Sequence, residues 1–269
     1  MDKFIKKNYS IVQDDGSIIE HTITFRPMPI FNELNTKFIS KAEADNYTVD
    51  CLKLERFPLD KFKDKIDMYN STLMTKCLTA NIEQTIKSLG YAYFTKGDYN
   101  LNIIGIRSTN SENTVNEFND ALVVTYKVDG SNRIEVYPIT TDPGTYYLES
   151  PLHSKGCAIL VPGQYRGAEK IGKHQGKYKA LVQCRPVNVY RDNNKDNKLD
   201  YVNIESGMFG INIHKAGVKS TQVNKNSAGC QVFAKADDFN KFMKLCDEAC
   251  KTYGDRFTYT LIEEKDLIL

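Results

Sequence analysis

Histidine is scarce in this chain of 269 residues, and long apolar runs are missing. The four histidines form neither an HExxH motif nor a CxxC pair followed by HxxxH, so the sequence predicts no zinc or other metal site. No stretch reaches the length of a membrane helix, so no membrane insertion is expected. The lysines near the start meet Gln13 and two aspartates before an apolar core could develop, and no secretory signal is predicted.

An excess of charge of one sign is also missing. Lys and Arg total 36 against 34 for Asp and Glu, which gives a formal net charge of +2. A balance this close does not indicate a polyanionic partner, and no nucleic-acid partner is predicted. Hydrophobic residues make up 41% and charged residues 26%, which is the composition of a globular chain long enough to bury a core. The composition does not define the oligomeric state.

The seven cysteines are odd in number and widely spaced, unlike the dense, even set of a small secreted disulfide framework. Free thiols in a reducing compartment fit this pattern better. Cysteine is among the most buried residue types, and six of the seven are therefore predicted to be structural: Cys51, Cys77, Cys157, Cys184, Cys246 and Cys250. By the same reasoning, His21, His153 and His174 are predicted to be ordinary polar residues.

The patterns of apolar and turn-forming residues predict an α+β fold. Strands are expected at residues 18–26, 103–107, 121–126, 133–139, 157–161, 178–182, 187–190 and 256–262. Helices are expected at residues 58–69 and 71–89, and from Asp237 or Asp238 to Gly254. Near residue 95 the sequence changes from helical patterns to short strand-like runs separated by turn residues, which predicts two parts. Residues 1–95 would form a small mixed region of unknown role, and residues 96–269 a β-rich domain with a C-terminal helix.

His214 and Cys230 are the candidate chemical pair. A thiol becomes a useful nucleophile when a neighbouring base makes thiolate available. Residues 211–214 end in His214 and read as a strand, and residues 231–233 read as a second strand. If these strands pair, His214 and Cys230 face each other at the mouth of the loop. The run from Ser227 to Cys230 (SAGC) allows a tight turn that presents N–H groups to a reacting carbonyl.

These residues resemble the catalytic domain of the L,D-transpeptidase, or YkuD-like, family. Its signature is a histidine, a loop of about this length, and then Ser/Thr-x-Gly-Cys. Residues 140–147 (TTDPGTYY) resemble the family's Thr-Pro-x-Gly-x-aromatic element, and residues 209–214 (FGINIH) resemble its Ile-His strand. Residues 162–174 are similar to phage-encoded and Bacteroidales proteins of unassigned role. The resemblance covers roughly residues 100–235 and implies a YkuD-like fold.

The resemblance implies a role for each residue of the signature. Cys230 would be the nucleophile and His214 its base, the Gly229 and Cys230 amides would line the oxyanion hole, and Ser227 would shape the turn. The substrate would be the stem peptide of peptidoglycan, processed without a metal or an organic cofactor. The candidates for substrate contact are Gln231, Arg166 and Tyr165.

Two positions depart from the family pattern. Ala228 stands where many members have His, and Val232 stands where many have Arg. Without that arginine, hydrolysis as an L,D-carboxypeptidase or endopeptidase is predicted as strongly as transpeptidation. A catalytic Cys230 would be alkylated by iodoacetamide faster, and at lower pH, than an ordinary thiol.

The missing signal leaves the route to the wall open. An enzyme made in the cytoplasm would meet peptidoglycan after lysis, by virion delivery or by non-classical export, and a phage-encoded lytic enzyme is one such case. The alternative is a virion or cell-wall-binding structural protein with a relic Cys/His site. Papain-like and NlpC/P60-type peptidases place Cys before His, and the sequence shows no convincing match to that order.

Residues 192–200 (DNNKDNKLD) place oxygen ligands at positions 1, 3, 5 and 9 of an EF-hand-like loop. The loop lacks the glycine at its sixth position and the glutamate at its twelfth. A solvated turn is therefore predicted, and calcium binding stays an open alternative.

Overall fold

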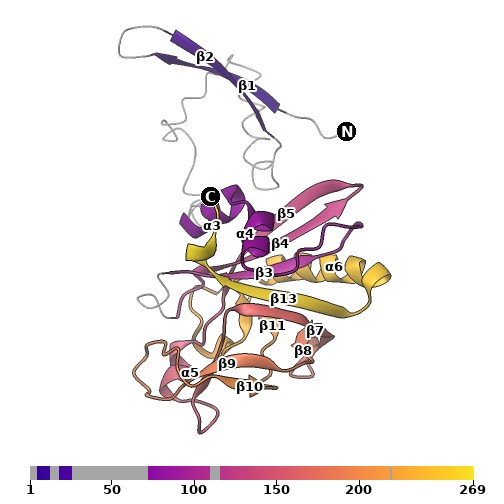
Figure 1. Cartoon of the computed structure of the whole chain (residues 1–269). Helices are drawn as coiled ribbons and strands as arrows, with labels where there is room; N and C mark the ends of the chain where they lie inside the picture. The colour runs from indigo at the N-terminus through magenta and orange to yellow at the C-terminus, as the bar shows by residue number, and fades with distance from the viewer. Residues whose placement is uncertain (1–4, 13–17, 26–71, 110–115, 219) are drawn as a thin grey trace. The chain divides into compact units, whose positions relative to one another are not determined.

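The computed structural model describes residues 5–12, 18–25, 72–109, 116–218 and 220–269 (Figure 1). The chain divides into two compact units, Met1–Lys65 and Ile66–Leu269. In the first unit, β1 (Ile5–Val12) and β2 (Ile18–Phe25) pair as antiparallel strands. The strand predicted at residues 18–26 is thereby confirmed. The predicted helix at residues 58–69 and Cys51 lie outside the described residues.

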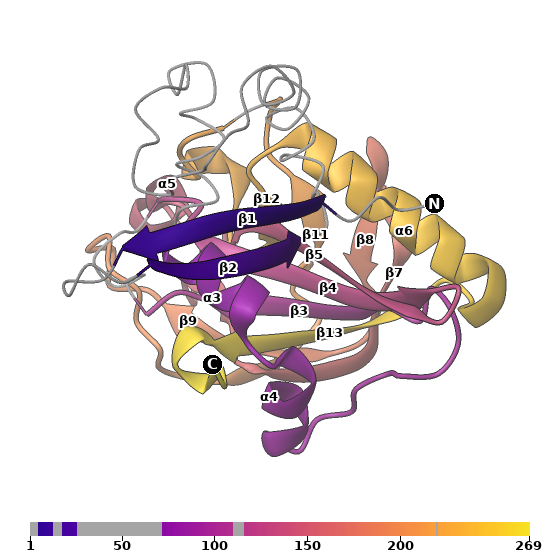
Figure 2. The same ribbon diagram turned by 90° about the horizontal axis from the view of Figure 1, so that it is seen from above.

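A closed eight-stranded barrel forms the centre of the second unit, with the strand order β11-β12-β5-β4-β3-β13-β7-β8. Most neighbours are antiparallel, whereas β11 runs parallel to β12 and β3 runs parallel to β13. Figure 2 shows β3, β4 and β13 lying side by side. The strands are β3 (Asn102–Arg107), β4 (Asp120–Val128), β5 (Ser131–Thr140), β7 (Gly163–His174), β8 (Tyr178–Gln183), β11 (Ile213–Lys215), β12 (Gln231–Phe233) and β13 (Arg256–Glu263).

A separate three-stranded sheet has the order β10-β9-β6. It consists of β6 (Cys157–Leu160), β9 (Val187–Asp192) and β10 (Glu205–Gly207). Together with the short helix α5 (Thr145–Glu149), it encloses a small core that contains Leu148, Ile159 and Leu199. The sheet therefore adds a second, smaller layer of structure to the barrel.

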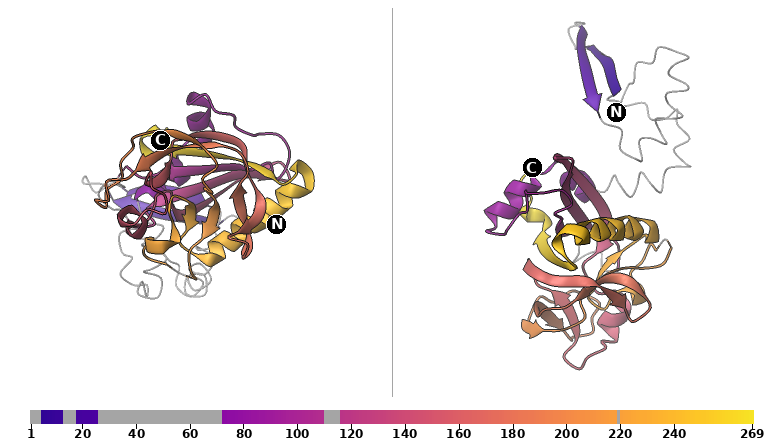
Figure 3. Two further views of the ribbon diagram at one scale, coloured as in Figure 1. Left: turned by 90° about the horizontal axis from the view of Figure 1, so that it is seen from below. Right: turned by 90° about the vertical axis from the view of Figure 1, so that its right-hand side faces the viewer.

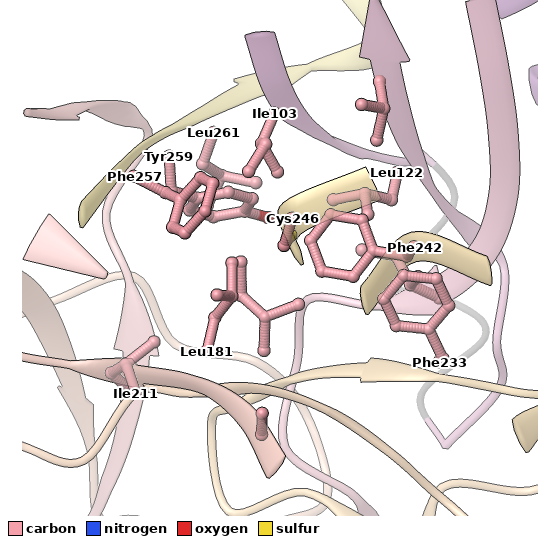
Figure 4. Close-up of a cluster of buried hydrophobic side chains, with 14 of the residues drawn as sticks. Ile103, Leu122, Leu181, Ile211, Phe233, Phe242, Cys246, Phe257, Tyr259 and Leu261 are labelled. Carbon is pink, nitrogen blue, oxygen red and sulfur yellow. The ribbon is translucent and has the colours of Figure 1, made fainter. Parts of the chain in front are cut away.

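The main core joins the barrel strands to the C-terminal helix α6 (Ala236–Tyr253). Figure 4 shows Phe242 and Cys246 of α6 beside Leu122, Tyr259 and Leu261 of the barrel. The apolar stripe that predicted α6 is thus the face that the helix buries. Its N-cap is Lys235, so the prediction of Asp237 or Asp238 was wrong. Both aspartates instead lie in the first helical turn, where the helix dipole favours negative charge.

Two short helices replace the single helix predicted at residues 71–89. They are α3 (Thr72–Thr79) and α4 (Ile82–Ser88). The break arises because the Asn81 side chain caps α4, accepting the Gln84 amide at 3.0 Å. Both helices pack against Ile104 of β3 and Val123 of β4. They therefore belong to the β-rich unit, and the division of the chain falls before them and not at residue 95.

The second unit is α+β, rich in strands, and carries a C-terminal helix, as predicted. Figure 3 shows α6 beside the barrel strands in two further views. Strand β7 was missed because its sequence, GQYRGAEKIGKH, is polar and contains two interior glycines, without the apolar alternation that predicts a strand. Within the described residues, no helix is long and apolar enough to cross a membrane.

Candidate active site

Strands β11 and β12 bring the candidate pair together. They run parallel, with Ile213 beside Gln231, and the Gln231 amide donates to the Asn212 carbonyl at 2.9 Å. In this register Asn212 lies beside Cys230. Because side chains alternate along a strand, Cys230, Asn212 and His214 share one face of the strand pair. The two segments pair, as predicted, with the regular part of β11 beginning at Ile213. They do not place His214 opposite Cys230 at the mouth of the loop, because the strands run parallel and His214 pairs with Val232.

His214 is buried, and its hydrogen bonds define its tautomer. Its Nδ1 lies 2.9 Å from the Lys215 carbonyl oxygen. A carbonyl oxygen only accepts, so Nδ1 carries the hydrogen and Nε2 keeps its lone pair. The Tyr178 hydroxyl lies 3.3 Å from the same Nδ1 and donates to the Lys215 carbonyl at 3.2 Å. Burial, followed by the nearby His174, lowers the pKa of His214 to about 4. The ring is therefore an uncharged base at neutral pH.

His174, which the sequence predicted to be an ordinary polar residue, stacks on the candidate base. The two ring centroids are 3.9 Å apart, and the ring planes are inclined by 21°. His174 ends β7 and is separated from His214 in the chain by β8, β9 and β10, so no local motif in the sequence could indicate this contact. Only the closure of the barrel places β7, β8 and β11 next to one another.

Cys230 is half-buried, and its thiol donates to the Gly210 carbonyl at 3.3 Å. Desolvation raises the pKa of Cys230 to about 11, against the opposing effect of a hydrogen bond from the Asn212 backbone amide. At neutral pH the site therefore holds a neutral thiol beside a neutral imidazole. This direction is opposite to the expected thiolate at unusually low pH, because the effect of burial outweighs that of the Asn212 hydrogen bond.

We expect iodoacetamide to alkylate Cys230 slowly at pH 7. A pKa of about 11 leaves roughly one thiol in ten thousand ionised, so alkylation should be roughly 300-fold slower than for a free thiol. The rate should increase up to about pH 11. Mass analysis of the Cys230 peptide over this pH range measures it, with Cys230→Ala as the blank. A rate that levels off below pH 8 would contradict the raised pKa.

Ser227 bridges the turn before the thiol. Its buried hydroxyl donates to the Cys230 carbonyl at 2.9 Å and accepts the Gly229 amide at 3.1 Å. Ser227 therefore shapes the turn, and the Gly229 N–H is already engaged. Of the two amides predicted for the oxyanion hole, only that of Cys230 itself is left as a candidate donor. To serve in the predicted oxyanion hole, the Gly229 amide would have to leave the Ser227 hydroxyl.

Gly229 fills a position that only glycine can occupy. Its φ is +122°, and a Cβ there would lie 1.9 Å from the Ala158 carbonyl oxygen. We expect Gly229→Ala to lower the free energy of unfolding by about 3 kcal/mol or more, because the strained backbone and the clash with a main-chain atom add together. Gly176, with φ +71° and open space around it, is the matched control. Gly176→Ala should cost only about 1 kcal/mol in urea unfolding, and equal losses in both variants would contradict the clash.

A buried charge cluster holds the segment that contacts the SAGC turn. The Arg107 Nε lies 3.0 Å from the Asp142 carboxylate, and Arg107 Nη2 donates to the Thr141 and Leu160 carbonyls at 3.2 and 3.1 Å. This cluster holds the TTDPG segment at the end of β5. From there the Gly144 amide donates to the Ser227 carbonyl at 3.0 Å. The element that resembled a family motif thus supports the turn that carries Cys230.

Of the three residues predicted to contact substrate, Gln231 faces the interior, and Tyr165 and Arg166 contact other parts of the chain. Gln231 is only 1% exposed, and its side-chain oxygen accepts the Tyr259 hydroxyl at 2.7 Å. The Tyr165 hydroxyl donates to the Val161 carbonyl at 2.6 Å, and the Arg166 guanidinium lies 5.8 Å from the centre of the Phe94 ring. Gln231 is placed to support the core and not to meet a substrate, because its position in β12 directs it away from the face of Cys230.

A cavity of about 370 Å³ next to the SAGC turn was not indicated by the sequence. Its lining joins apolar side chains to the Arg191 guanidinium. Arg191 Nε pairs with Glu205 at 2.8 Å, and the guanidinium lies 4.7 Å from the centre of the Phe209 ring. The lining includes Leu152, His153, Met208, Phe209, Arg191 and Ala228. The cavity can therefore accept a ligand that is partly apolar and partly polar.

Among the described residues, no group of three or more His, Cys, Asp or Glu side chains is arranged to hold a metal ion. In the EF-hand-like segment, the Asp192 carboxylate accepts the Asp200 amide at 3.1 Å, and Asn194 donates to the Asp200 carboxylate at 2.6 Å. These oxygens satisfy the backbone and side chains of the loop itself, as in an ordinary polar turn.

Of the six thiols predicted to be structural, five lie within the described residues, and all five are free of disulfides. Cys77, Cys157 and Cys246 are buried, as predicted, whereas Cys184 and Cys250 are half-buried. Burial raises the pKa of Cys77 and of Cys157 to about 12, which makes both thiols unreactive at neutral pH. No protein-family model, curated protein or solved structure was found to match this chain.

Proposed function

We propose that this chain is a cysteine acyl-transfer enzyme of the L,D-transpeptidase type, acting on the stem peptides of peptidoglycan. The observation that carries the proposal is the tautomer of His214. Its Nδ1–H is donated to the Lys215 carbonyl, so Nε2 keeps the lone pair of a base. The same face of the β11–β12 pair presents the Cys230 thiol. The choice of peptidoglycan rests on the resemblance of the FGINIH strand, the SAGC turn and the TTDPGTYY segment to that family.

The pKa values of the pair favour general-base activation of a neutral thiol. As the sulfur attacks the substrate carbonyl carbon, the S–H proton passes to His214 Nε2 and a C–S bond forms. The Cys230 amide is the candidate donor to the oxyanion. The imidazolium then returns the proton to the leaving amine nitrogen as the C–N bond breaks, which leaves a thioester. Water or a second amine attacks the thioester, and Cys230 recovers its proton.

The cavity beside Ala228 would seat the acyl donor. It borders the turn that carries Cys230, and its Arg191 is held in place by Glu205 and by the Gly156 carbonyl, which accepts at 3.2 Å. Such a fixed cation beside apolar side chains suits a short peptide that carries a polar group. Hydrolysis and transpeptidation differ only in what attacks the thioester, and both stay within the proposal.

The test is incubation of the full chain with purified peptidoglycan, followed by mass analysis of the muropeptides. Loss of a terminal stem residue indicates a carboxypeptidase, cleaved cross-links an endopeptidase, and new cross-links a transpeptidase. Any of the three supports the proposal. Unchanged muropeptides at all pH values between 5 and 9 would overturn it and favour the virion or wall-binding structural protein.

A further inference from the structure

His174, whose ring stacks on the His214 imidazole, has no part in the chemistry described above. Both rings are buried, with His174 at 8% and His214 at 4% relative exposure. Their centroid distance of 3.9 Å is van der Waals contact between nearly parallel rings. A ring held against such a flat neighbour cannot rotate about its side-chain bonds without displacing that neighbour. The His214 ring is therefore fixed from one side by His174 and at its Nδ1 by the Lys215 carbonyl.

Asn212 determines the orientation of His174. The Asn212 side-chain oxygen accepts the Gln183 backbone amide at 3.0 Å, which directs its NH2 group toward His174. That group lies 3.1 Å from His174 Nδ1. An amide NH2 only donates, so Nδ1 of His174 accepts and the hydrogen of its ring resides on Nε2. The same residue provides the backbone carbonyl that pairs with β12 next to Cys230. One asparagine thus links the orientation of His174 to the strand that carries the thiol.

Burial and neighbouring charge oppose a positive charge on either ring, whereas the Lys215 carbonyl that accepts from His214 favours one on His214. From β8, the Tyr178 hydroxyl reaches His214 Nδ1, and the Lys215 ammonium lies 5.4 Å from the centre of the Tyr178 ring. From the β7–β8 turn, Lys177 acts on His174, whose pKa is lowered by burial and by that charge. From α6, the apolar Phe239 packs edge-on against Tyr178. Cys230 lies immediately before β12, and the buried Glu169 of β7 raises the pKa of its thiol.

Two like charges in stacked rings repel each other strongly where water is excluded. We propose that His174 is a positioning residue, whose ring orients the His214 imidazole and keeps it uncharged, so that the base stays available in mildly acidic surroundings. The consequence for catalysis rests on the proposed function, whereas the consequence for the titration of His214 does not. His174 itself acts through His214 and exchanges no proton with the substrate.

The test is a titration of the histidine side chains by ¹⁵N NMR in the full chain, with the wild type compared with His174→Phe and His174→Ala. In the wild type, the pKa of His214 should be about 4. Phe keeps a flat ring but removes the second charge, so a smaller upward shift of the midpoint is expected. Ala also admits water, and the midpoint should move up by roughly 1 to 2 pH units, toward the ordinary value for histidine. Lys179→Met, which changes an exposed residue of β8 paired with Asp247, is the control and should cause no shift.

A His214 midpoint that stays within about 0.3 pH units of the wild type in both folded His174 variants would overturn the proposal. Circular dichroism verifies the fold, and His174→Phe retains the packing if His174→Ala does not fold. If the proposed function holds, the acid limit of muropeptide turnover should move by the same amount as the NMR midpoint. The titration needs no substrate, so a failure to process peptidoglycan and a failure of the stacked-ring proposal would be seen separately.

Discussion

Replacing Cys230 by alanine is expected, under the proposed function, to abolish muropeptide turnover, by roughly 10⁴-fold or more, because Cys230 is the group proposed to form the thioester. The thiol makes one hydrogen bond through its hydrogen, to the Gly210 carbonyl, and the residue is half-buried. Its loss should therefore change the free energy of unfolding by only about 1 kcal/mol. Turnover is measured from muropeptide masses, and stability from unfolding in urea.

Cys250→Ala is the matched control, since it removes another half-buried thiol, from the last turns of α6. That variant should keep the activity of the wild type. Turnover that persists in Cys230→Ala would remove Cys230 from the mechanism, whatever the fate of the substrate. Loss of turnover in both variants would point instead to a general effect of cysteine replacement on the fold.

Arg107→Met is expected to lower the free energy of unfolding by about 3–5 kcal/mol, because it leaves buried acidic groups without their cation. Arg107 is 2% exposed and lies 3.0 Å from the Asp142 carboxylate. Asp120 lies in the same cluster and accepts the Ser108 and Thr141 amides at 2.8 and 2.7 Å. Burial, and then the charge of Asp142, raise the pKa of Asp120 to about 7. Arg107 therefore supplies the positive charge that offsets the cost of burying the two carboxyl groups.

The pH dependence of stability follows from the raised pKa of Asp120. In the unfolded chain the carboxyl loses its proton near its ordinary value of 3.8, whereas the folded protein holds the proton up to about pH 7. Between these values the folded state binds more protons, so this group contributes stability at low pH that is lost as the pH rises toward 7. Without Arg107, the penalty for a negative charge there increases, and the deficit of the variant should be larger at pH 8 than at pH 5.

Urea unfolding at both pH values measures this effect. Arg185→Met is the control, because Arg185 is exposed and donates only to the Arg166 carbonyl, at 3.3 Å. It should change stability by at most about 0.5 kcal/mol. Adding Asp142→Asn to Arg107→Met should recover part of the loss, since one uncompensated charge is then removed. A deficit below about 1 kcal/mol in Arg107→Met would contradict the role of the cluster.

Local patterns were sufficient to predict several elements. Helix α6 and strand β13 were recognised because each carries its apolar residues at the period of its own structure. The sequence also predicted that the strand ending at His214 pairs with the strand after Cys230, because the two strands are close in the chain and flank one loop. Strand β7 gave no such pattern, because its neighbours in the barrel determine its conformation more than its own polar sequence does.

The sequence by itself identified Cys230 and His214 as the candidate pair and predicted the tight turn from Ser227 to Cys230. It could do so because these residues lie within one loop and two short strands. The tertiary structure alone decided the protonation states, the engagement of the Gly229 amide, and the contact between His174 and His214. Burial and stacking arise from strands that are distant in the chain and adjacent in the barrel. A pKa depends on what surrounds a group, and those surroundings exist only once the barrel has closed.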